Sequence, residues 1–201
     1  MNAIVPFDMA KSLQVRNEND LPPHITFEQF KKVYDNITGL DQLMWGLLWE
    51  TGGRITAVLN IRWIDIDMNT KELKLLIQKK KRHTTIQIPL SNALINDLRN
   101  YSLYVKPETQ NFLFKTKSVF GRMTRQGAYK KIREWGKVHL NMTIHPHMTR
   151  HGLAIYLLSQ GVPLPAIARR LGHSNVFITQ KSYLVITPEL DRQLTAHVPM
   201  R

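Results

Sequence analysis

The chain has 201 residues, 43% of them hydrophobic, which is the composition of one globular domain of ordinary size rather than of a disordered segment. Its 28 Lys and Arg outnumber 15 Asp and Glu, and the net charge of +13 favours a polyanionic partner, nucleic acid before an anionic membrane surface. The lack of cysteine excludes a disulfide scaffold, a thiolate zinc finger, an iron–sulfur protein and a cysteine nucleophile.

Targeting signals are not expected. The N-terminal segment has no apolar stretch behind a basic start, so it does not resemble a signal peptide. No apolar run approaches the roughly 18 residues that a membrane helix needs. We therefore expect a cytoplasmic, nucleoid-associated protein with no membrane partner.

Helical patterns follow a polar N-terminal arm over residues 1–24. Thr26 and the glutamine three residues later form a capping-box pair, and apolar residues recur at helical spacing over 27–34. Residues 40–50 are apolar nearly all round, which predicts a buried helix. A double glycine interrupts it, and a further short helix is expected over 54–61.

The period then changes from helix to strand. Apolar residues alternate with polar ones over 73–77 and again over 86–88, and a basic run at 79–83 separates the two stretches. This pattern predicts two antiparallel strands joined by a strongly basic turn.

The second half of the chain returns to helix after a short extended piece at 112–114. The expected helices cover residues 91–104, 124–139, 146–159, 163–171, 176–186 and, more briefly, 189–197. The sum is an α+β fold that is mostly helical, with one small antiparallel sheet.

Two basic features in the first half suit a phosphate-containing partner. Arg54 follows a double glycine, which lets backbone and guanidinium approach a phosphate, although an arginine in this place is commonly a surface or helix-capping residue. The run at 79–83 is commonly a solvated hairpin tip. In a DNA-binding domain it makes a cationic finger that reaches a groove, and a lysine in it could deliver a proton.

The segment from His145 to His151 carries three histidines and an arginine. His147 and Arg150 are spaced to share one face of a helix, and His151 falls on or near that face. Zinc binding by His147 and His151 is disfavoured because no carboxylate ligand lies nearby. No metal site is expected.

Two later residues each have an ordinary structural interpretation. His173 follows a glycine at a helix end, where a histidine is commonly a capping or packing residue. Tyr183 lies on a predicted helix, where a tyrosine is normally half buried in packing. Taken singly, neither residue indicates a function.

Together, and in this order, these motifs resemble the tyrosine recombinase or phage integrase family. The resemblance runs from about Phe27 to Ile186 and rests on TGGR, the basic hairpin, HxxRH, LGH and the tyrosine that follows. It implies a catalytic domain over residues 25–187, followed by a tail over 188–201 that either docks on a neighbouring subunit or folds back on its own domain. The residues that it assigns to catalysis are Arg54, Lys81, His147, Arg150, His173 and the nucleophile Tyr183.

Two positions depart from the family pattern. The family usually carries Glu or Asp three residues after its first arginine, where this chain has Ala57. Its tyrosine commonly follows the LGH histidine one residue sooner than Tyr183 does here. Neither departure removes a group assigned to catalysis.

The resemblance implies DNA cleavage by phosphoryl transfer to a tyrosine. The two arginines would hold the non-bridging phosphate oxygens, and the two histidines would bond the same oxygens or help to take the tyrosine proton. Tyr183 would form a 3′-phosphotyrosyl link while Lys81 protonates the 5′ oxygen. No metal, ATP or other cofactor is expected.

Double-stranded DNA is the expected partner. Its predicted contacts are Lys79, Lys80, Arg82, Arg122, Arg125, Lys130, Lys131, Arg133 and Lys137, most of the later ones on a helix that could lie across or in the major groove. By resemblance we expect a homo-oligomer, a dimer on one site and a tetramer in the synapse, with accessory DNA-bending proteins. Because family members carry an N-terminal clamp domain, the chain is either an excised catalytic fragment or a short recombinase.

Three other functions stay open on the sequence. A catalytically weak or inactive family member acting as a DNA-binding regulator is favoured by Ala57 and the extra residue before Tyr183, and opposed by the otherwise intact residue set. A topoisomerase-like nicking activity would use the same chemistry. A generic RNA-binding protein is disfavoured because no aromatic RNA-binding platform is present.

Overall fold

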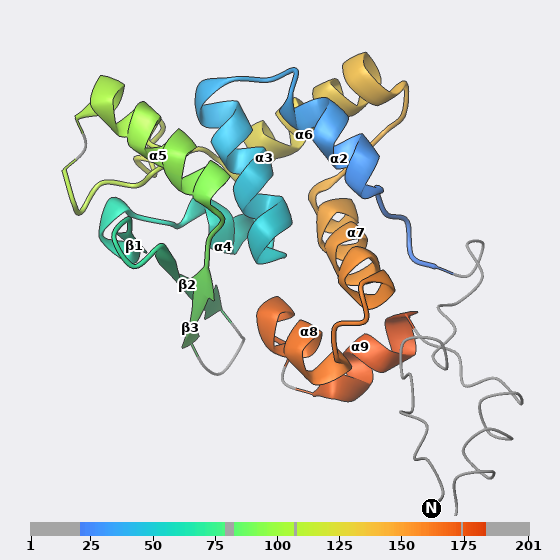
Figure 1. The fold of residues 1–201 in the computed structure, drawn as a ribbon. Coiled ribbons are helices and arrows are strands. Elements are labelled where there is room, and N and C mark those ends of the chain that lie inside the picture. Colours follow the sequence, from blue (N-terminus) through green and yellow to red (C-terminus); the bar gives the residue numbers. More distant parts are fainter. Residues whose placement is uncertain (1–20, 79–82, 107, 174, 184–201) are drawn as a thin grey trace, which may run out of the picture.

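The computed structural model describes residues 21–78, 83–106, 108–173 and 175–183 (Figure 1). The predicted arm, the basic hairpin tip at 79–82 and the tail at 188–201 lie almost wholly outside these residues. The elements are α2 (Phe27–Tyr34), α3 (Gly39–Thr51), α4 (Ile55–Leu59), η2 (Trp63–Asp65), β1 (Ile66–Asp67), β2 (Glu72–Gln78), β3 (His83–Pro89), α5 (Asn92–Val105), α6 (Arg125–Leu140), α7 (Pro146–Ser159), α8 (Leu164–Leu171) and α9 (Val176–Tyr183).

Side-chain caps explain where several helices begin. The predicted capping box of α2 is confirmed: Thr26 Oγ1 accepts from the Gln29 amide at 3.2 Å, and Gln29 Oε1 accepts from the Thr26 amide at 3.0 Å. Ser91 caps α5 and Thr124 caps α6 in the same way, each through its hydroxyl. The predicted helix at 54–61 is shorter than expected, because Arg54 serves as the N-cap of α4 and Asn60 ends it.

The sheet is antiparallel, in the order β1-β2-β3. Leu73 pairs with Ile88 and Leu75 with Ile86, so the predicted alternation places one face of β2 in the core. The sequence analysis did not predict β1, because a two-residue strand carries no measurable period. The piece predicted as extended at 112–114 forms an isolated bridge from Phe112 to Arg62.

The main core surrounds α3, which is apolar nearly all round and lies between α5 and α7 (Figure 1). Phe30 stacks on Trp49 at 4.5 Å between ring centroids, and the Trp45 indole N–H donates to the Phe30 carbonyl at 3.0 Å. These contacts hold α2 against α3, and the hydrogen bond satisfies the buried indole N–H of Trp45.

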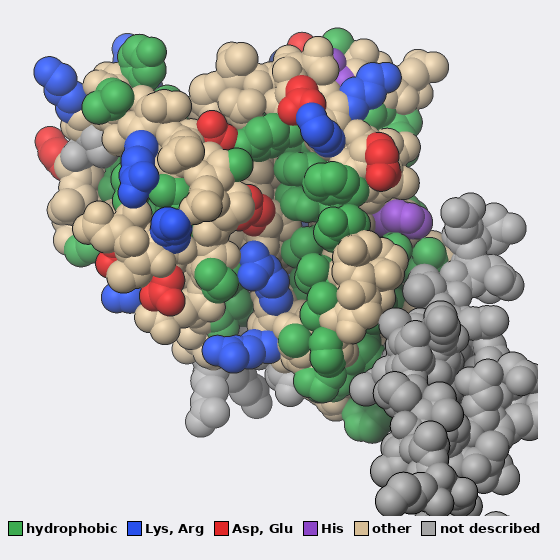
Figure 2. Space-filling view, in the orientation of Figure 1, with side chains coloured by type: hydrophobic (Ala, Val, Ile, Leu, Met, Phe, Trp, Pro, Cys, Tyr) green, Lys and Arg blue, Asp and Glu red, His purple; other side chains and the backbone are tan. Residues whose placement is uncertain are grey.

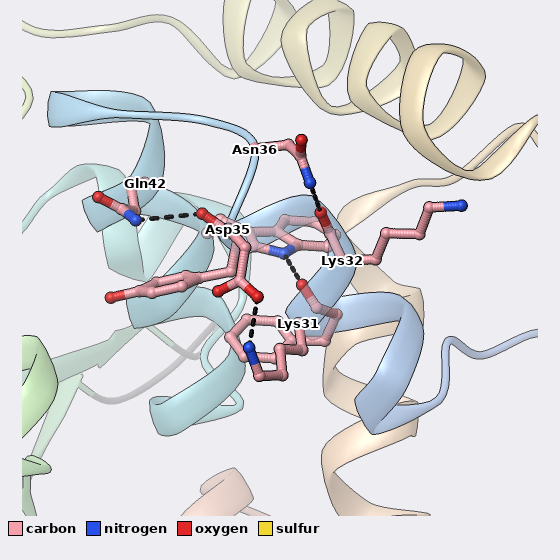
Figure 3. Close-up of polar contacts among 8 residues, drawn as sticks. Lys31, Lys32, Asp35, Asn36 and Gln42 are labelled. Carbon is pink, nitrogen blue, oxygen red and sulfur yellow. Dashed lines mark hydrogen bonds and ion pairs between the residues drawn. The ribbon is translucent and has the colours of Figure 1, made fainter.

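Polar contacts close the corner between α2 and α3 (Figure 3). Asn36 Nδ2 donates to the Lys32 carbonyl at 2.8 Å and Gln42 Nε2 to the Tyr34 carbonyl at 3.1 Å. Lys31 forms an ion pair with Asp35 one turn later on the same surface. The last carbonyls of α2 thus find partners outside the helix.

A second, smaller apolar cluster joins α7, α8 and α9. It consists of Ala154, Ile167, Leu171 and Tyr183. In Figure 1, α8 and α9 lie together at one end of α7, away from α5 and α6. The C-terminal helices therefore have an apolar cluster of their own.

Candidate functional site

Arg150 lies at the centre of the candidate site. Its side chain is 5% exposed, and Nη1 donates to the Gly52 carbonyl at 2.6 Å. Gly52 ends α3 at φ 58°, a left-handed conformation that favours glycine. Burial, and next the charge of Arg54, lower the pKa of Arg150 to about 10, so its guanidinium still carries a full charge near neutral pH.

His173 is bonded through both ring nitrogens. Arg150 Nη2 lies 2.6 Å from His173 Nε2, and because a guanidinium only donates, this nitrogen accepts. The ring proton therefore lies on Nδ1, which donates to Thr179 Oγ1 at 2.8 Å. Gly172, the left-handed C-cap of α8, turns the chain so that His173 reaches Arg150 from the neighbouring helix.

Arg54 completes a pair of guanidinium groups. It is exposed at the N-cap of α4 and lines a small pocket together with Arg150. Ala57 lines the same pocket, at the position where the sequence analysis noted a missing carboxylate. The orientation of Arg150 depends instead on the Gly52 carbonyl and His173. Two cations on one pocket suit a phosphate group.

His147 lies where several positive charges converge. Its ring is exposed to solvent on the first turn of α7. Burial lowers its pKa, and the charges of Arg150, Arg54, His145 and Arg125 lower it further. The neutral form of His147 is therefore favoured, and Arg125 places the start of α6 within electrostatic range of this site.

Tyr183 is buried at the end of α9, with 1% of its surface exposed. Its hydroxyl lies 2.6 Å from His151 Nδ1, and the two rings meet edge to face at 5.8 Å between centroids. Burial raises the pKa of Tyr183 to about 12, against a smaller lowering by Arg150. Burial and nearby positive charge lower the pKa of His151 to about 4, so both side chains are neutral and the phenol O–H donates.

The structure thus brings together Arg54, His147, Arg150 and His173, and Tyr183 lies within electrostatic range of Arg150. The predicted Lys81, with Lys79, Lys80 and Arg82, lies outside the described residues. Sequence reasoning missed the contact of His151 with Tyr183, although it placed this histidine on or near the face of His147 and considered it only as a metal ligand. Among the described residues, no cluster of three or more His, Cys, Asp or Glu could hold a metal ion.

Basic residues cover the exposed face of α6. Arg125, Lys130, Arg133 and Lys137 line one open surface groove at helical spacing. Lys131 points elsewhere and pairs with Asp41 of α3 at 2.8 Å. Arg122 lies before the helix, over the Phe112 ring, and donates to the Met123 carbonyl. None of the described helices is long and apolar enough to cross a membrane.

The family model of the phage integrase family matches residues 23–189. The chain belongs to this family. Among phage integrase relatives, a probable integrase/recombinase protein of Methanocaldococcus jannaschii is 33% identical over 147 residues, covering 69% of this chain and 44% of that protein. Tyrosine recombinase XerD of Staphylococcus haemolyticus is also 33% identical over 147 residues, covering 70% of this chain and 48% of XerD. The chain spans about half the length of these curated relatives.

Solved structures share the fold of this phage integrase chain. The crystal structure of the XerA recombinase matches with a TM-score of 0.69 at 22% identity, covering 90% of this chain and 67% of XerA. The site-specific recombinase XerH bound to its difH substrate matches with a TM-score of 0.71 at 19% identity, covering 89% of this chain and 55% of XerH. The predicted fold class, mostly helical with one small antiparallel sheet, is confirmed.

Proposed function

We propose that this chain is the catalytic domain of a site-specific DNA recombinase of the integrase type. It would cleave and rejoin duplex DNA through a covalent 3′-phosphotyrosyl intermediate, without metal or ATP. The observation that carries the proposal is the buried Arg150, which shares a pocket with Arg54 and lies within electrostatic range of the Tyr183 phenol. Family membership and its match to most of the chain support it.

The chemistry follows from this arrangement. Arg54 and Arg150 would hold the non-bridging oxygens of a DNA phosphate and stabilise the charge that grows on them during attack. Donors of this kind typically contribute about 3–4 kcal/mol each to lowering the barrier. Tyr183 would attack phosphorus, and the 5′ oxygen would leave with a proton from Lys81, a role assigned by family resemblance alone.

The proposed resting state keeps the nucleophile out of reach. A tyrosine with 1% of its surface exposed cannot touch a DNA phosphate, so cleavage requires a rearrangement that uncovers Tyr183. Its hydroxyl is neutral and already hydrogen-bonded, which lowers its reactivity in the unbound protein. DNA binding would therefore precede activation.

The exposed basic face of α6, made of Arg125, Lys130, Arg133 and Lys137, is the proposed DNA-binding surface among the described residues. The proximity of Arg125 to His147 connects this face to the phosphate pocket. A DNA strand lying along α6 would then pass Arg54 and Arg150. The protein would act on nucleoid DNA in the cytoplasm.

We further propose that copies of the chain assemble on DNA, a dimer on each site and a tetramer in the synapse. An open apolar groove favours this assembly, where hydrophobic side chains gather in a band on one face (Figure 2). It is lined by residues of α2, α3, α7 and α8, including Phe27, Trp49, Leu157 and Ile167. The C-terminal tail, outside the described residues, carries Leu190, Leu194 and Val198 at helical spacing for docking on a neighbour.

The test is covalent capture on a nicked suicide duplex whose centre is randomised, so that no target site need be known. In EDTA, wild type is expected to form a protein–DNA adduct that survives denaturation, and Tyr183→Phe to form none. Tyr156→Phe is the matched control, because Tyr156 packs on Phe27 and Trp49 away from the arginine pocket. Tight binding without an adduct would instead support the DNA-binding regulator.

A further inference from the structure

We propose that His151 is the group that takes the proton from Tyr183 when the tyrosine attacks the DNA phosphate. The inference rests on the proposed function and adds a catalytic residue to it. By family resemblance, His147 and His173 would bond the phosphate oxygens or help to take the tyrosine proton, and His151 has no part in the reaction.

Contact geometry selects His151. With Tyr183 buried, His151 Nδ1 lies 2.6 Å from the phenol oxygen, within the range required of a general base, and the role requires that the rearrangement that uncovers Tyr183 keep this contact. Among the described residues, this nitrogen is the acceptor that Tyr183 meets. His151 also directly follows Arg150 on α7, so one helix carries both the cation that would hold phosphate and the base beside the nucleophile.

The other two candidate histidines, His147 and His173, are placed for other roles. His173 uses Nε2 to accept from Arg150 and Nδ1 to donate to Thr179, so its accepting nitrogen is occupied. His147 is exposed one turn before His151, at 6.4 Å between ring centroids, and lies within electrostatic range of Arg150 and Arg54. It is placed to bond a phosphate oxygen rather than the phenol.

The proton and electron pairs balance as follows. The Tyr183 O–H bond breaks, its proton moves to His151 Nδ1, and the oxygen electron pair forms the bond to phosphorus. The bond from phosphorus to the 5′ oxygen breaks, and its electron pair leaves with that oxygen, which takes a proton from Lys81. His151 is then a cation, and in the rejoining step it returns the proton to the tyrosine oxygen.

The charges around His151 make this transfer depend on DNA. His145, His147 and Arg150 on α7 and His24 before α2 all disfavour a charged His151, and burial disfavours it most. In the free protein the imidazolium is therefore unstable, and the phenol keeps its proton. A phosphate anion bound beside Arg150 would offset these positive charges, so that proton transfer becomes favourable only with the substrate in place.

The experiment measures single-turnover cleavage of the suicide duplex by wild type, His151→Asn and His151→Ala. Asparagine is the informative variant, because its Oδ1 can accept the phenol hydrogen bond but cannot take the proton. His139→Asn is the matched control: His139 lies in the last turn of α6 and is not among the charged groups that act on His151. Melting temperature and DNA affinity are measured for every protein.

We expect both His151 variants to bind DNA normally and to cleave about 10²–10⁴-fold more slowly, the usual contribution of a general base. Their residual rates should rise about tenfold per pH unit, because hydroxide must then remove the phenol proton. Added imidazole should partly restore His151→Ala. His139→Asn should cleave at the wild-type rate.

Three outcomes would contradict this role in different ways. Wild-type cleavage by His151→Asn would mean that the hydrogen bond only positions the tyrosine. Faster cleavage by His151→Ala would mean that the contact only restrains it. Each of these overturns the role of His151 and leaves the proposed function intact, whereas a wild type that forms no adduct overturns both.

Discussion

At Arg150, two of the five guanidinium N–H groups have protein partners, the Gly52 carbonyl and His173. The other three have no partner among the residues that the structure describes, so they can face a phosphate in a geometry that the first two have already set. Lysine could not reproduce this arrangement, because its three donors rotate about one nitrogen. Burial therefore fixes the orientation of the Arg150 guanidinium and also strengthens its electrostatic attraction for a phosphate.

The lowered pKa of His151, about 4, predicts how stability depends on pH. The unfolded chain binds a proton on this histidine near pH 6.5, whereas the folded protein does not until about pH 4. Stability is therefore lost as pH falls through this window. His147, whose pKa is also lowered, acts in the same direction.

Melting temperatures between pH 7 and pH 4 check this prediction. Wild type should lose stability more steeply than His151→Asn, which has no proton to bind at this position. Parallel curves for the two proteins would show that His151 is not held neutral by the fold.

At the scale of single elements, the end of α3 positions the arginine pocket, and two glycines allow its role to be tested. Gly52 and Gly39 both have φ near +60°, but they differ in their surroundings. A Cβ on Gly52 would lie 2.6 Å from Leu171 Cδ2, whereas none of the described atoms lies within 4 Å of the Cβ position of Gly39.

Gly39→Ala should therefore cost roughly 1–2 kcal/mol of stability from backbone strain alone. Gly52→Ala should cost roughly 1–3 kcal/mol more, because the added methyl crowds Leu171. It should also abolish adduct formation, since it displaces the carbonyl that orients Arg150. Urea denaturation and the suicide duplex measure the two effects. Equal losses in both variants would exclude crowding at Gly52 as the cause.

Local signals predicted most elements, because the residues that begin, end and pattern a helix or strand are neighbours in the sequence. The capping box at Thr26 was predicted, the helices expected over 91–104 and 124–139 start at the residues that cap them, and α7 begins and ends where its proline and sequence period predicted. The two-residue β1 could not be predicted from local sequence, since it is a strand only through its pairing with β2.

The candidate site likewise has residues that could be predicted from the sequence and contacts that could not. The resemblance of the motifs, in their order along the chain, to the tyrosine recombinase family predicted Arg54, Arg150 and His173 as one group. The hydrogen bond between His151 and Tyr183 joins residues 32 positions apart and depends on how α9 packs on α7 and α8. No local sequence pattern therefore predicts it. The pairing of Lys131 with Asp41, which turns one predicted DNA contact toward α3, is another property of packing alone.

At the scale of the whole molecule, the net charge of +13 predicts a steep loss of DNA affinity with salt. Removing a phosphate contact should reduce the slope of log K against log salt by about 1. Lys130→Ala and Lys137→Ala, on the exposed face of α6, should each show this reduction. Lys131→Ala should show a smaller change, because Asp41 already pairs with this lysine. Fluorescence anisotropy over a salt series measures the slopes, and equal slopes for all three variants would place DNA on another face.

The small apolar cluster of Ala154, Ile167, Leu171 and Tyr183 gives the nucleophile its own local equilibrium. Separating α9 from this cluster breaks far fewer contacts than melting the core around α3, so its opening free energy lies below that of global unfolding. The fraction of unbound molecules that expose Tyr183 is then a Boltzmann population. It changes tenfold for about every 1.4 kcal/mol. Trimming Ile167 or Leu171, two uncharged side chains with no part in the reaction, would thus change how often the free protein exposes Tyr183.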